Sequence, residues 1–301
     1  MSSIAYVTDE AMLEYHRLCR NRSILFWRLT EKKKFTDFRK GDLLFFFARP
    51  VRGRKKGFVG YAHYDSTKHL SLRQMWDLYK EKTGYDSEER MREAVMKAAK
   101  ADIPEKMSCL YLTDVVFFLS PIYPEEVGLN ISSKLESYCY LDRSDPKITA
   151  DLMEKAEEHG IDLWSADSDA APEIIFRNDA VRHKLAAIHR EIGKETGSEK
   201  EKSACHRYAR EKAAEEGWEM VRGSRCDCMQ IMKDGSVRIA VPFAAQANDR
   251  ELRIREFAGR LYIYRLLAEK AQLGKSIRFE VIGNNIPDVV KEITERINEE
   301  L

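Results

Sequence analysis

The first 140 residues alternate between short apolar runs and polar, mostly basic connections. Runs this short, bounded by glycine, proline and charged residues, predict β-strands. The predicted strands are 23–29, 43–48, 58–64, 109–119 and 137–141. Apolar residues at helical spacing predict helices over 8–20, 70–79 and 87–100. Because few helices separate about five strands, the pattern favours a small mixed β-barrel over a sheet with a helix after every strand.

The remaining residues show two further patterns. Residues 143–203 combine helical periodicity over 149–159 and 178–193 with acidic and polar stretches, which indicates a helical connector. Residues 204–301 predict a small α/β domain: helix 204–216, strands 218–221, 226–232 and 237–241, helix 250–271, strand 277–282 and helix 287–300. We therefore expect an α+β protein organised as 1–142, 143–203 and 204–301.

Composition narrows the class of protein. A chain of 301 residues is long enough for two domains, and no run approaches the ~20 apolar residues of a membrane span. The N-terminus has no signal-peptide pattern, so we expect a cytoplasmic protein that is not bound to a membrane. Cys226-Asp227-Cys228 does not have a zinc spacing, and the seven histidines form no recognisable cluster, so no metal site is predicted.

Charge is concentrated near the N-terminus. The whole chain carries a formal charge of +1, yet residues 28–56 hold eleven Lys or Arg against three acidic residues. A local excess of cations beside aromatic strands indicates a surface for a polyanion, with nucleic acid the expected partner.

Two segments of the first domain carry a family resemblance. Residues 39–46 form a charged Lys-Gly-Asp turn that leads into an apolar strand, and residues 57–62 read Gly-Phe-Val-Gly-Tyr-Ala. Together they resemble the PUA-like superfamily, closest to its EVE-type branch, which is related to the YTH readers of methylated adenine. The related ASCH branch is disfavoured, because its Gly-x-Lys-x-x-Glu-x-Arg signature is absent. The resemblance covers roughly residues 20–142.

This resemblance implies binding of nucleic acid, often with a modified base held in an aromatic cage. Aromatic faces restore the stacking that a flipped base loses, and nearby cations hold phosphates. The candidate cage residues are Trp27, Tyr61, Tyr64 and Trp76. The candidate phosphate contacts are Arg28, Lys40, Arg49, Arg52, Arg54, Lys55 and Lys56.

The last domain resembles the core of PD-(D/E)xK restriction nucleases. That core needs an aspartate at one strand and Glu-x-Lys on the next, because two carboxylates hold a divalent metal and the lysine polarises the attacking water. Asp227 matches the aspartate, but Ala240-Val241-Pro242 stands where Glu-x-Lys is expected. We therefore expect an inactive domain without cofactor, and Mg²⁺ only if a neighbouring acid such as Glu215, Glu251 or Glu256 rebuilds the site.

Three functions stay open. The favoured one is a nucleic-acid-binding protein that reads a modified or flipped base in restriction or defence, with DNA expected over RNA. The alternatives are a metal-dependent nuclease with a rearranged site and a non-catalytic interaction protein. The apolar stripe of helix 250–271 could pair two copies into a homodimer, although packing on its own sheet is the simpler interpretation.

Overall fold

The computed structural model describes residues 3–29, 35–49, 55–99, 103–143, 145, 147–163 and 172–299. The chain divides into two compact units, Met1–Arg177 and Asn178–Leu301. The boundary falls inside helix α5 (Pro172–Ile192). The predicted connector 143–203 is thus divided between the two units instead of forming a part of its own. Among the helices of these residues, none has the length and apolar character needed to cross a membrane.

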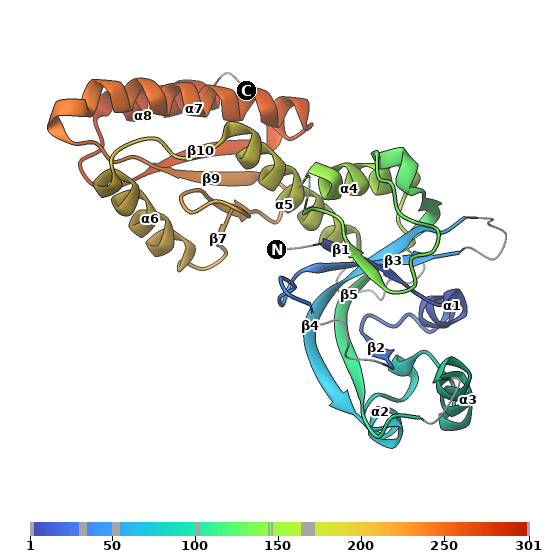
Figure 1. Cartoon of the computed structure of the whole chain (residues 1–301). Coiled ribbons are helices and arrows are strands. Elements are labelled where there is room, and N and C mark those ends of the chain that lie inside the picture. The colour runs from blue at the N-terminus through green and yellow to red at the C-terminus, as the bar shows by residue number, and fades with distance from the viewer. Residues whose placement is uncertain are drawn as a thin grey trace. The chain divides into compact units, whose positions relative to one another are not determined.

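A six-stranded sheet organises the first unit (Figure 1). Its strands are β1 (Ser3–Val7), β2 (Ile24–Arg28), β3 (Leu43–Ala48), β4 (Gly57–Leu70), β5 (Met107–Ile122) and β6 (Tyr138–Tyr140). They lie in the order β2-β5-β4-β3-β1-β6, with β1 parallel to β3 and the other neighbours antiparallel. The edge strands β2 and β6 are not bonded to each other, so the described sheet is open and the predicted closed barrel is not found.

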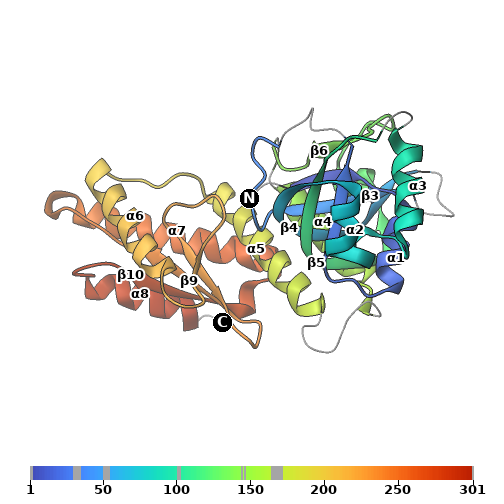
Figure 2. The same cartoon turned by 90° about the horizontal axis from the view of Figure 1, so that it is seen from below.

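Within the described residues, four α-helices lie entirely in the first unit. They are α1 (Glu10–Leu18), α2 (Leu72–Tyr79), α3 (Glu88–Ala99) and α4 (Lys147–His159). Thr8 and Asp9 both have side chains suited to cap the first helix, and in the structure the Asp9 side chain accepts the Met12 N–H at 3.0 Å. Helices α1 and α3 lie on the same side of the sheet (Figure 2).

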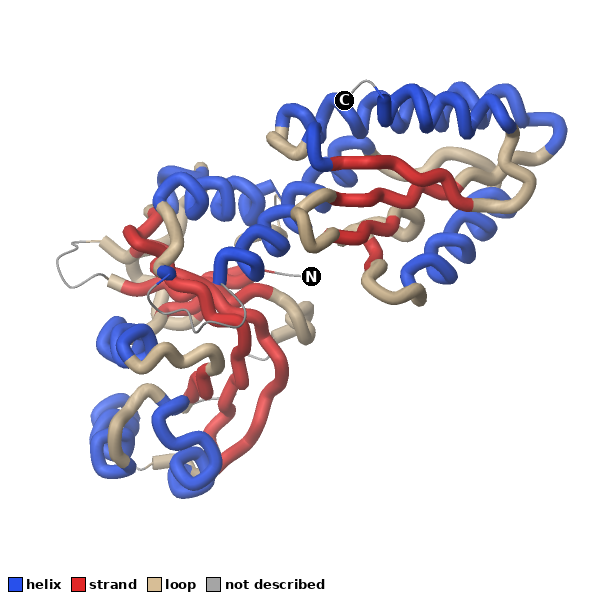
Figure 3. The backbone as a smooth tube through the Cα atoms, turned by 180° about the vertical axis from the view of Figure 1, so that it is seen from behind, coloured by secondary structure: helices blue, strands red, loops and turns tan. Residues whose placement is uncertain are grey.

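The predicted strands of the first unit are confirmed, with two differences. Strand β1 was not predicted. It has only five residues, too few for a clear alternation of apolar and polar positions, and no turn residues precede it. Strands β4 and β5 are longer than predicted and form a curved pair interrupted by bulges, visible in Figure 3. At one bulge Gly60 lies so close to the Val116 carbonyl of β5 that a side chain there would collide with it. Glycine therefore allows the two strands to approach at this point.

Strand β3 is buried on both faces. Phe45, Phe46 and Phe47 expose 0%, 0% and 3% of their surface, which confirms that they belong to the core. Phe46 packs in a cluster with Leu44 and Phe117. Phe45 lies on the other face, where its ring is 5.5 Å from that of Tyr61. The purely apolar pattern of this strand is thus explained by its place inside the sheet.

The second unit holds a four-stranded sheet in the order β10-β9-β8-β7. Its elements after α5 are α6 (Glu199–Ala213), β7 (Glu219–Met220), β8 (Cys228–Ile231), β9 (Val237–Pro242), α7 (Arg250–Lys270), β10 (Ile277–Ile282) and α8 (Asp288–Glu299). Strands β7, β8 and β9 form an antiparallel meander, and β10 lies parallel to β9. Helix α6 lies on one side of these strands and α7 and α8 on the other (Figure 1). The predicted α/β order is confirmed.

Helix α6 begins five residues before its predicted start. Ser198 accepts the Glu201 N–H, and the Glu201 carboxylate accepts the Ser198 N–H, so a reciprocal capping box fixes the first turn. The apolar stripe of α7 packs on its own sheet, because Phe257, Leu261 and Tyr264 are buried in the core of the second unit. These residues of the stripe therefore pack within the second unit, as the simpler interpretation expects, and the homodimer stays a prediction.

Candidate functional site

Arg28, at the end of β2, lies against aromatic rings. Its guanidinium carbon is 4.9 Å from the centre of the Phe35 ring, 5.7 Å from Tyr6 and 5.9 Å from Tyr138. These rings come from the segment after β2, from β1 and from β6. A guanidinium group over a ring face gains electrostatic attraction and stacking at once. The fold thus gathers three distant segments around one arginine.

Half-buried rings continue from this arginine across the sheet. Phe35 lies 5.0 Å from Phe38 and 4.7 Å from Tyr138, and Phe38 lies 4.9 Å from Tyr64 on β4. Tyr138 in turn lies 5.9 Å from Tyr140. We define the Arg28 cluster as Arg28, Phe35, Phe38, Tyr64, Tyr138 and Tyr140. Each member keeps part of its surface in solvent, so the cluster forms a partly exposed aromatic surface.

Arg143 borders the Arg28 cluster and is exposed. Its guanidinium carbon stands 3.6 Å from the centre of the Tyr140 ring, and it donates to the Thr36 hydroxyl at 2.8 Å. The Tyr140 hydroxyl accepts the backbone N–H groups of Thr36 and Asp37 at 3.2 and 3.3 Å. The segment 35–38 is therefore held against β6, which keeps Phe35 and Phe38 in place.

Tyr6 and Tyr138 of this region have raised pKa values and are neutral at neutral pH. Burial raises the pKa of Tyr138, and the neighbouring Tyr140 adds to the increase. Burial also raises the pKa of Tyr6, which Arg28 offsets only in part. Neutral rings next to guanidinium groups provide flat stacking surfaces beside positive charge.

The four predicted cage aromatics fall into three different clusters. Tyr64 belongs to the Arg28 cluster, whereas Trp27 and Trp76 pack around Met75 and Met91 under α2 and α3. Tyr61 is completely buried, between the rings of Phe45, Phe118 and Phe176. The structure therefore does not bring these four side chains into one cage. Tyr61 in particular cannot stack on a base, because its ring is completely buried in the core of the first unit.

The predicted phosphate contacts have mixed surroundings. Arg28 lies in the aromatic cluster, Lys40 is exposed and pairs with Asp65 at 2.6 Å, and Lys55 pairs with Glu125 at 2.9 Å. Lys56 donates to the Leu135 carbonyl at 2.7 Å, and Arg49 is exposed. Arg52 and Arg54 lie outside the described residues.

Sequence reasoning missed most of the Arg28 cluster. Phe35, Phe38, Tyr138, Tyr140 and Arg143 did not stand out as candidates. The signal available was the Tyr-Cys-Tyr pattern of residues 138–140, because residues two apart on a strand point to the same face. Their convergence with Arg28 depends on the pairing of β6 with β1, which local pattern does not encode.

Asp227 of the second unit is fully buried just before β8. Its carboxylate accepts from Arg260 at 2.7 Å and from His189 at 3.1 Å. Burial raises the pKa of Asp227, but His189 and Arg260 outweigh it, so the pKa lies below its ordinary value. The carboxylate is therefore ionised and neutralised by a cation, in contrast to the paired carboxylates that hold Mg²⁺.

Strand β9 supplies apolar residues beside Asp227. The pairing of Cys228 with Ala240 places Val241 next to Asp227, and Val241 and Phe243 are buried in the core. Val241 is the middle one of the three positions, Ala240-Val241-Pro242, at which the nuclease resemblance expects Glu-x-Lys, and all three are buried. The sequence offers Glu215, Glu251 and Glu256 as replacement acids. Of these, Glu256 lines a cavity beside Asp227, but its carboxylate accepts hydrogen bonds from Arg253 and Thr196.

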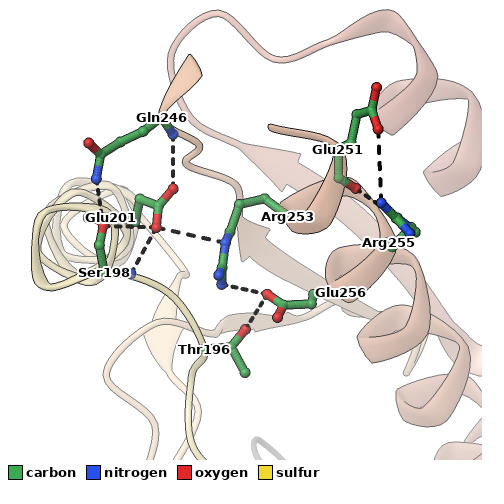
Figure 4. Close-up of polar contacts among 8 residues, drawn as sticks. All are labelled: Thr196, Ser198, Glu201, Gln246, Glu251, Arg253, Arg255 and Glu256. Atoms are coloured by element: carbon green, nitrogen blue, oxygen red, sulfur yellow. Dashed lines mark hydrogen bonds and ion pairs between the residues drawn. The ribbon is translucent and has the colours of Figure 1, made fainter. Parts of the chain in front are cut away.

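A cavity of about 310 Å³ opens beside Asp227, lined also by Glu195, Cys226, Arg253 and Arg260. Thr196, Arg253 and Glu256, which also line the cavity, belong to a polar network (Figure 4). In this network the Glu201 carboxylate accepts from the Gln246 N–H at 2.9 Å, and its Oε2 lies 3.8 Å from the Nε of Arg253. Burial raises the pKa of Glu201, but these partners and Ser198 lower it below its ordinary value. The network fixes the start of α6 against α7.

Comparisons with known proteins find little. No family model matches the sequence, and no curated protein matches it. Solved structures of the ASCH protein from Zymomonas mobilis are similar to about half of this chain. The unmodified protein shows 14% identity over 50% of this chain and 94% of its own, with a TM-score of 0.36. Two variants of it show 16% and 14% identity over 51% of this chain and 98% and 95% of their own, with TM-scores of 0.36 and 0.37. Similarity at these TM-scores carries no conclusion about this chain.

Proposed function

We propose that this chain binds nucleic acid on the Arg28 cluster and the adjacent Arg143. The observation that carries the proposal is the placement of two guanidinium groups against partly exposed rings from several segments of one sheet. Bases stack on aromatic rings and on guanidinium planes, each stacked base contributing about 1–3 kcal/mol. The excess of cations over residues 28–56 supports the same proposal.

Phosphates would be held at the border of the cluster. Arg143 is exposed and already oriented by Tyr140 and Thr36, so little side-chain freedom is lost when it binds an anion. Lys40 pairs with Asp65 only at the exposed surface, where an ion pair contributes little, and it can therefore turn to a phosphate. Together these cations would follow a backbone whose bases face the rings.

The proposal extends to the kind of ligand. A base that has left its stack exposes both faces, and the half-buried rings of Phe38, Tyr64 and Tyr138 offer matching surfaces. We propose a modified or flipped base in DNA, in a restriction or defence setting, as the EVE-type resemblance implies. The second unit would then assist binding without cutting, because Arg260 and His189 bind Oδ2 of Asp227 and no second carboxylate or lysine stands at Ala240-Val241-Pro242.

The test is a binding titration of the full chain at two salt concentrations. Labelled single-stranded DNA, duplex DNA with and without a modified base, and RNA of the same sequence are compared by fluorescence anisotropy. We expect affinity that falls as salt rises, because each contacted phosphate releases counterions. We also expect Arg143→Ala to weaken binding and to reduce the slope of log affinity against log salt by about 0.7–0.9.

The matched control is Arg73→Ala. Arg73 is exposed like Arg143, lies in α2 of the same unit and pairs with Asp77 at 3.6 Å, but it is outside the cluster. It should leave affinity and salt slope unchanged. Absence of salt-dependent affinity for every ligand, or equal effects of the two arginine variants, would overturn the proposal and favour an interaction protein.

The rival function is a metal-dependent nuclease. The same DNA substrates are incubated with Mg²⁺ or Mn²⁺, and we expect no cleavage. Asp227→Asn keeps the size of the side chain and serves as the control. Cleavage by the native chain that this variant abolishes would contradict the non-cutting role of the second unit, while binding at the Arg28 cluster would still be judged by Arg143→Ala.

A further inference from the structure

Three side chains of types that can bind a metal ion meet in the second unit. They are the carboxylate of Glu195, the imidazole of His206 and the thiol of Cys226. One ligand atom from each lies within 4.8 Å of the other two. They come from the segment between α5 and α6, from α6 itself and from the turn before β8. Their spacing along the sequence shows no metal motif, so only the fold brings them together.

The backbone around each of the three residues is fixed by local structure. The Ser224 hydroxyl accepts the N–H groups of Cys226 at 3.0 Å and of the following residue at 2.8 Å, which fixes the turn before β8. Beside Glu195, the Thr196 hydroxyl donates to Glu256 at 2.7 Å, as Figure 4 shows. His206 lies in the interior of α6. The site is therefore built on anchored backbone.

A second observation points to a missing partner. The His206 Nε2 atom is buried, and within the described residues it has no hydrogen-bond partner. Buried ring nitrogens are normally satisfied, so an enclosed one without a partner needs an explanation. Cys226 is also buried, with 2% of its surface exposed, and Glu195 is half-buried. A cation between the three ligands would satisfy the nitrogen and neutralise the carboxylate.

We propose that Glu195, His206 and Cys226 bind a zinc ion. Zinc takes sulfur, nitrogen and oxygen ligands in tetrahedral sites, and this set provides one of each. When three atoms lie within 4.8 Å of one another, a metal ion placed between them is at most about 2.8 Å from each atom. Zinc bonds to these ligand types are about 2.0–2.3 Å long. A shift of well under about 1 Å per ligand therefore completes the geometry.

The remaining coordination position faces the cavity of about 310 Å³, because Glu195 and Cys226 both line it. Asp227 does not complete the site, because the group of ligand atoms that lie within 4.8 Å of one another does not include its carboxylate. The fourth ligand is thus a water or a small molecule from the cavity. This site differs from the magnesium site of the nuclease resemblance in its residues and in its preference for softer metals.

Metal content of the full chain tests the site. The protein is stripped with a chelator, dialysed against Zn²⁺ and measured by mass spectrometry of the metal. One equivalent of zinc is expected. In competition titrations, His206→Ala and Cys226→Ser should each weaken binding by at least about 10–100-fold, since even the loss of an outer partner costs that much.

Controls and a second readout separate ligation from general damage. His69→Ala and Cys139→Ser change the same residue types in the first unit and should leave zinc affinity unchanged. Cobalt bound in place of zinc should give thiolate-to-cobalt absorption that Cys226→Ser removes and Cys139→Ser keeps. If the buried variants unfold, Glu195→Gln on its surface segment should still lose affinity. Zinc binding below one equivalent, or affinity unchanged in Glu195→Gln and His206→Ala, would overturn the proposal.

Discussion

Arg28 of the first unit and Arg260 of the second are both partly buried, but their partners differ. Arg28 faces rings that keep part of their surface in solvent, and the exposed Arg143 continues the same surface. Arg260 donates to Asp227, a carboxylate with no exposed surface. One arginine thus belongs to an aromatic surface, whereas the other lines a cavity and is paired with a buried carboxylate. Residue type alone therefore does not identify a binding surface.

The largest effect is expected from breaking the buried pair of the second unit. Arg260→Met leaves the Asp227 carboxylate buried without its cation, which should cost about 3–5 kcal/mol of the free energy of unfolding. Hydrogen exchange of peptides from β8 and β9 measures this loss within the second unit.

The double variant Arg260→Met with Asp227→Asn is the control for this pair. It removes both charges and should recover much of the stability, because no unpaired charge stays buried. A loss below about 1 kcal/mol in the single variant would show that the pair is not desolvated as the structure indicates. The contrast with the open Arg28 cluster would then disappear.

The next prediction separates two tyrosines of β4. Tyr61→Leu removes a fully buried ring and should cost about 2 kcal/mol of stability, with nucleic-acid affinity unchanged once the chain is folded. Tyr64→Leu removes a partly exposed ring and should cost little stability but about 1–3 kcal/mol of binding free energy. Denaturation and anisotropy measure the two quantities. Equal losses of affinity would place both residues in the binding surface and contradict their burial.

Acid should weaken the first unit before the second. Burial lowers the pKa of His16, inside α1, to about 4. The unfolded chain binds this proton near pH 6.5, so stability is complete above that value and falls as the pH drops toward 4. Between pH 7 and pH 5 the expected loss is about 2 kcal/mol.

Hydrogen exchange at the two pH values assigns this loss to one unit. His16→Leu removes the titrating group and should flatten the pH dependence of the first unit. In the second unit the pKa of Glu201 is lowered in the folded state. Its contribution to stability is therefore complete above the ordinary carboxyl pKa near 4 and is lost only at lower pH, outside the range from pH 7 to pH 5. A second unit that weakens first between pH 7 and 5 would contradict both assignments.

The sequence predicted most elements of the fold because their signals are local. Asp9 and Gly235 mark a helix start and a hairpin turn by their own chemistry, and the structure has both. Strand β1 and the early start of α6 were missed, since the first lacks a turn signal and the second depends on the reciprocal cap of Ser198 and Glu201. The local sequence pattern therefore predicts which helices and strands form more accurately than it predicts the residue at which each one begins.

The candidate sites could be predicted only in part, because they depend on pairing between distant segments. The basic run and Arg28 were visible, yet Tyr138 joins Arg28 only through the pairing of β6 with β1. The ligand set of Glu195, His206 and Cys226 has no regular spacing, so it did not appear as a motif. Tyr61 and Tyr64 look alike in sequence, and only the bulged register of β4 separates their environments.

The smallest effect concerns the competition for Lys40 at the edge of the open face. Its ammonium group pairs with Asp65 at 2.6 Å, and both lie at the surface, so the pair adds little to stability. Asp65→Asn removes the competing carboxylate, which should raise nucleic-acid affinity about 2–3-fold at low salt and leave thermal stability unchanged. The gain should vanish at high salt and in the background of Lys40→Ala, as anisotropy titrations at two salt concentrations can measure. Glu125→Gln frees Lys55 in the same way, at a pair farther along the sheet from the Arg28 cluster, and should change affinity less. If both substitutions raised affinity equally, binding would follow net charge, and the rings around Arg28 would not define the site.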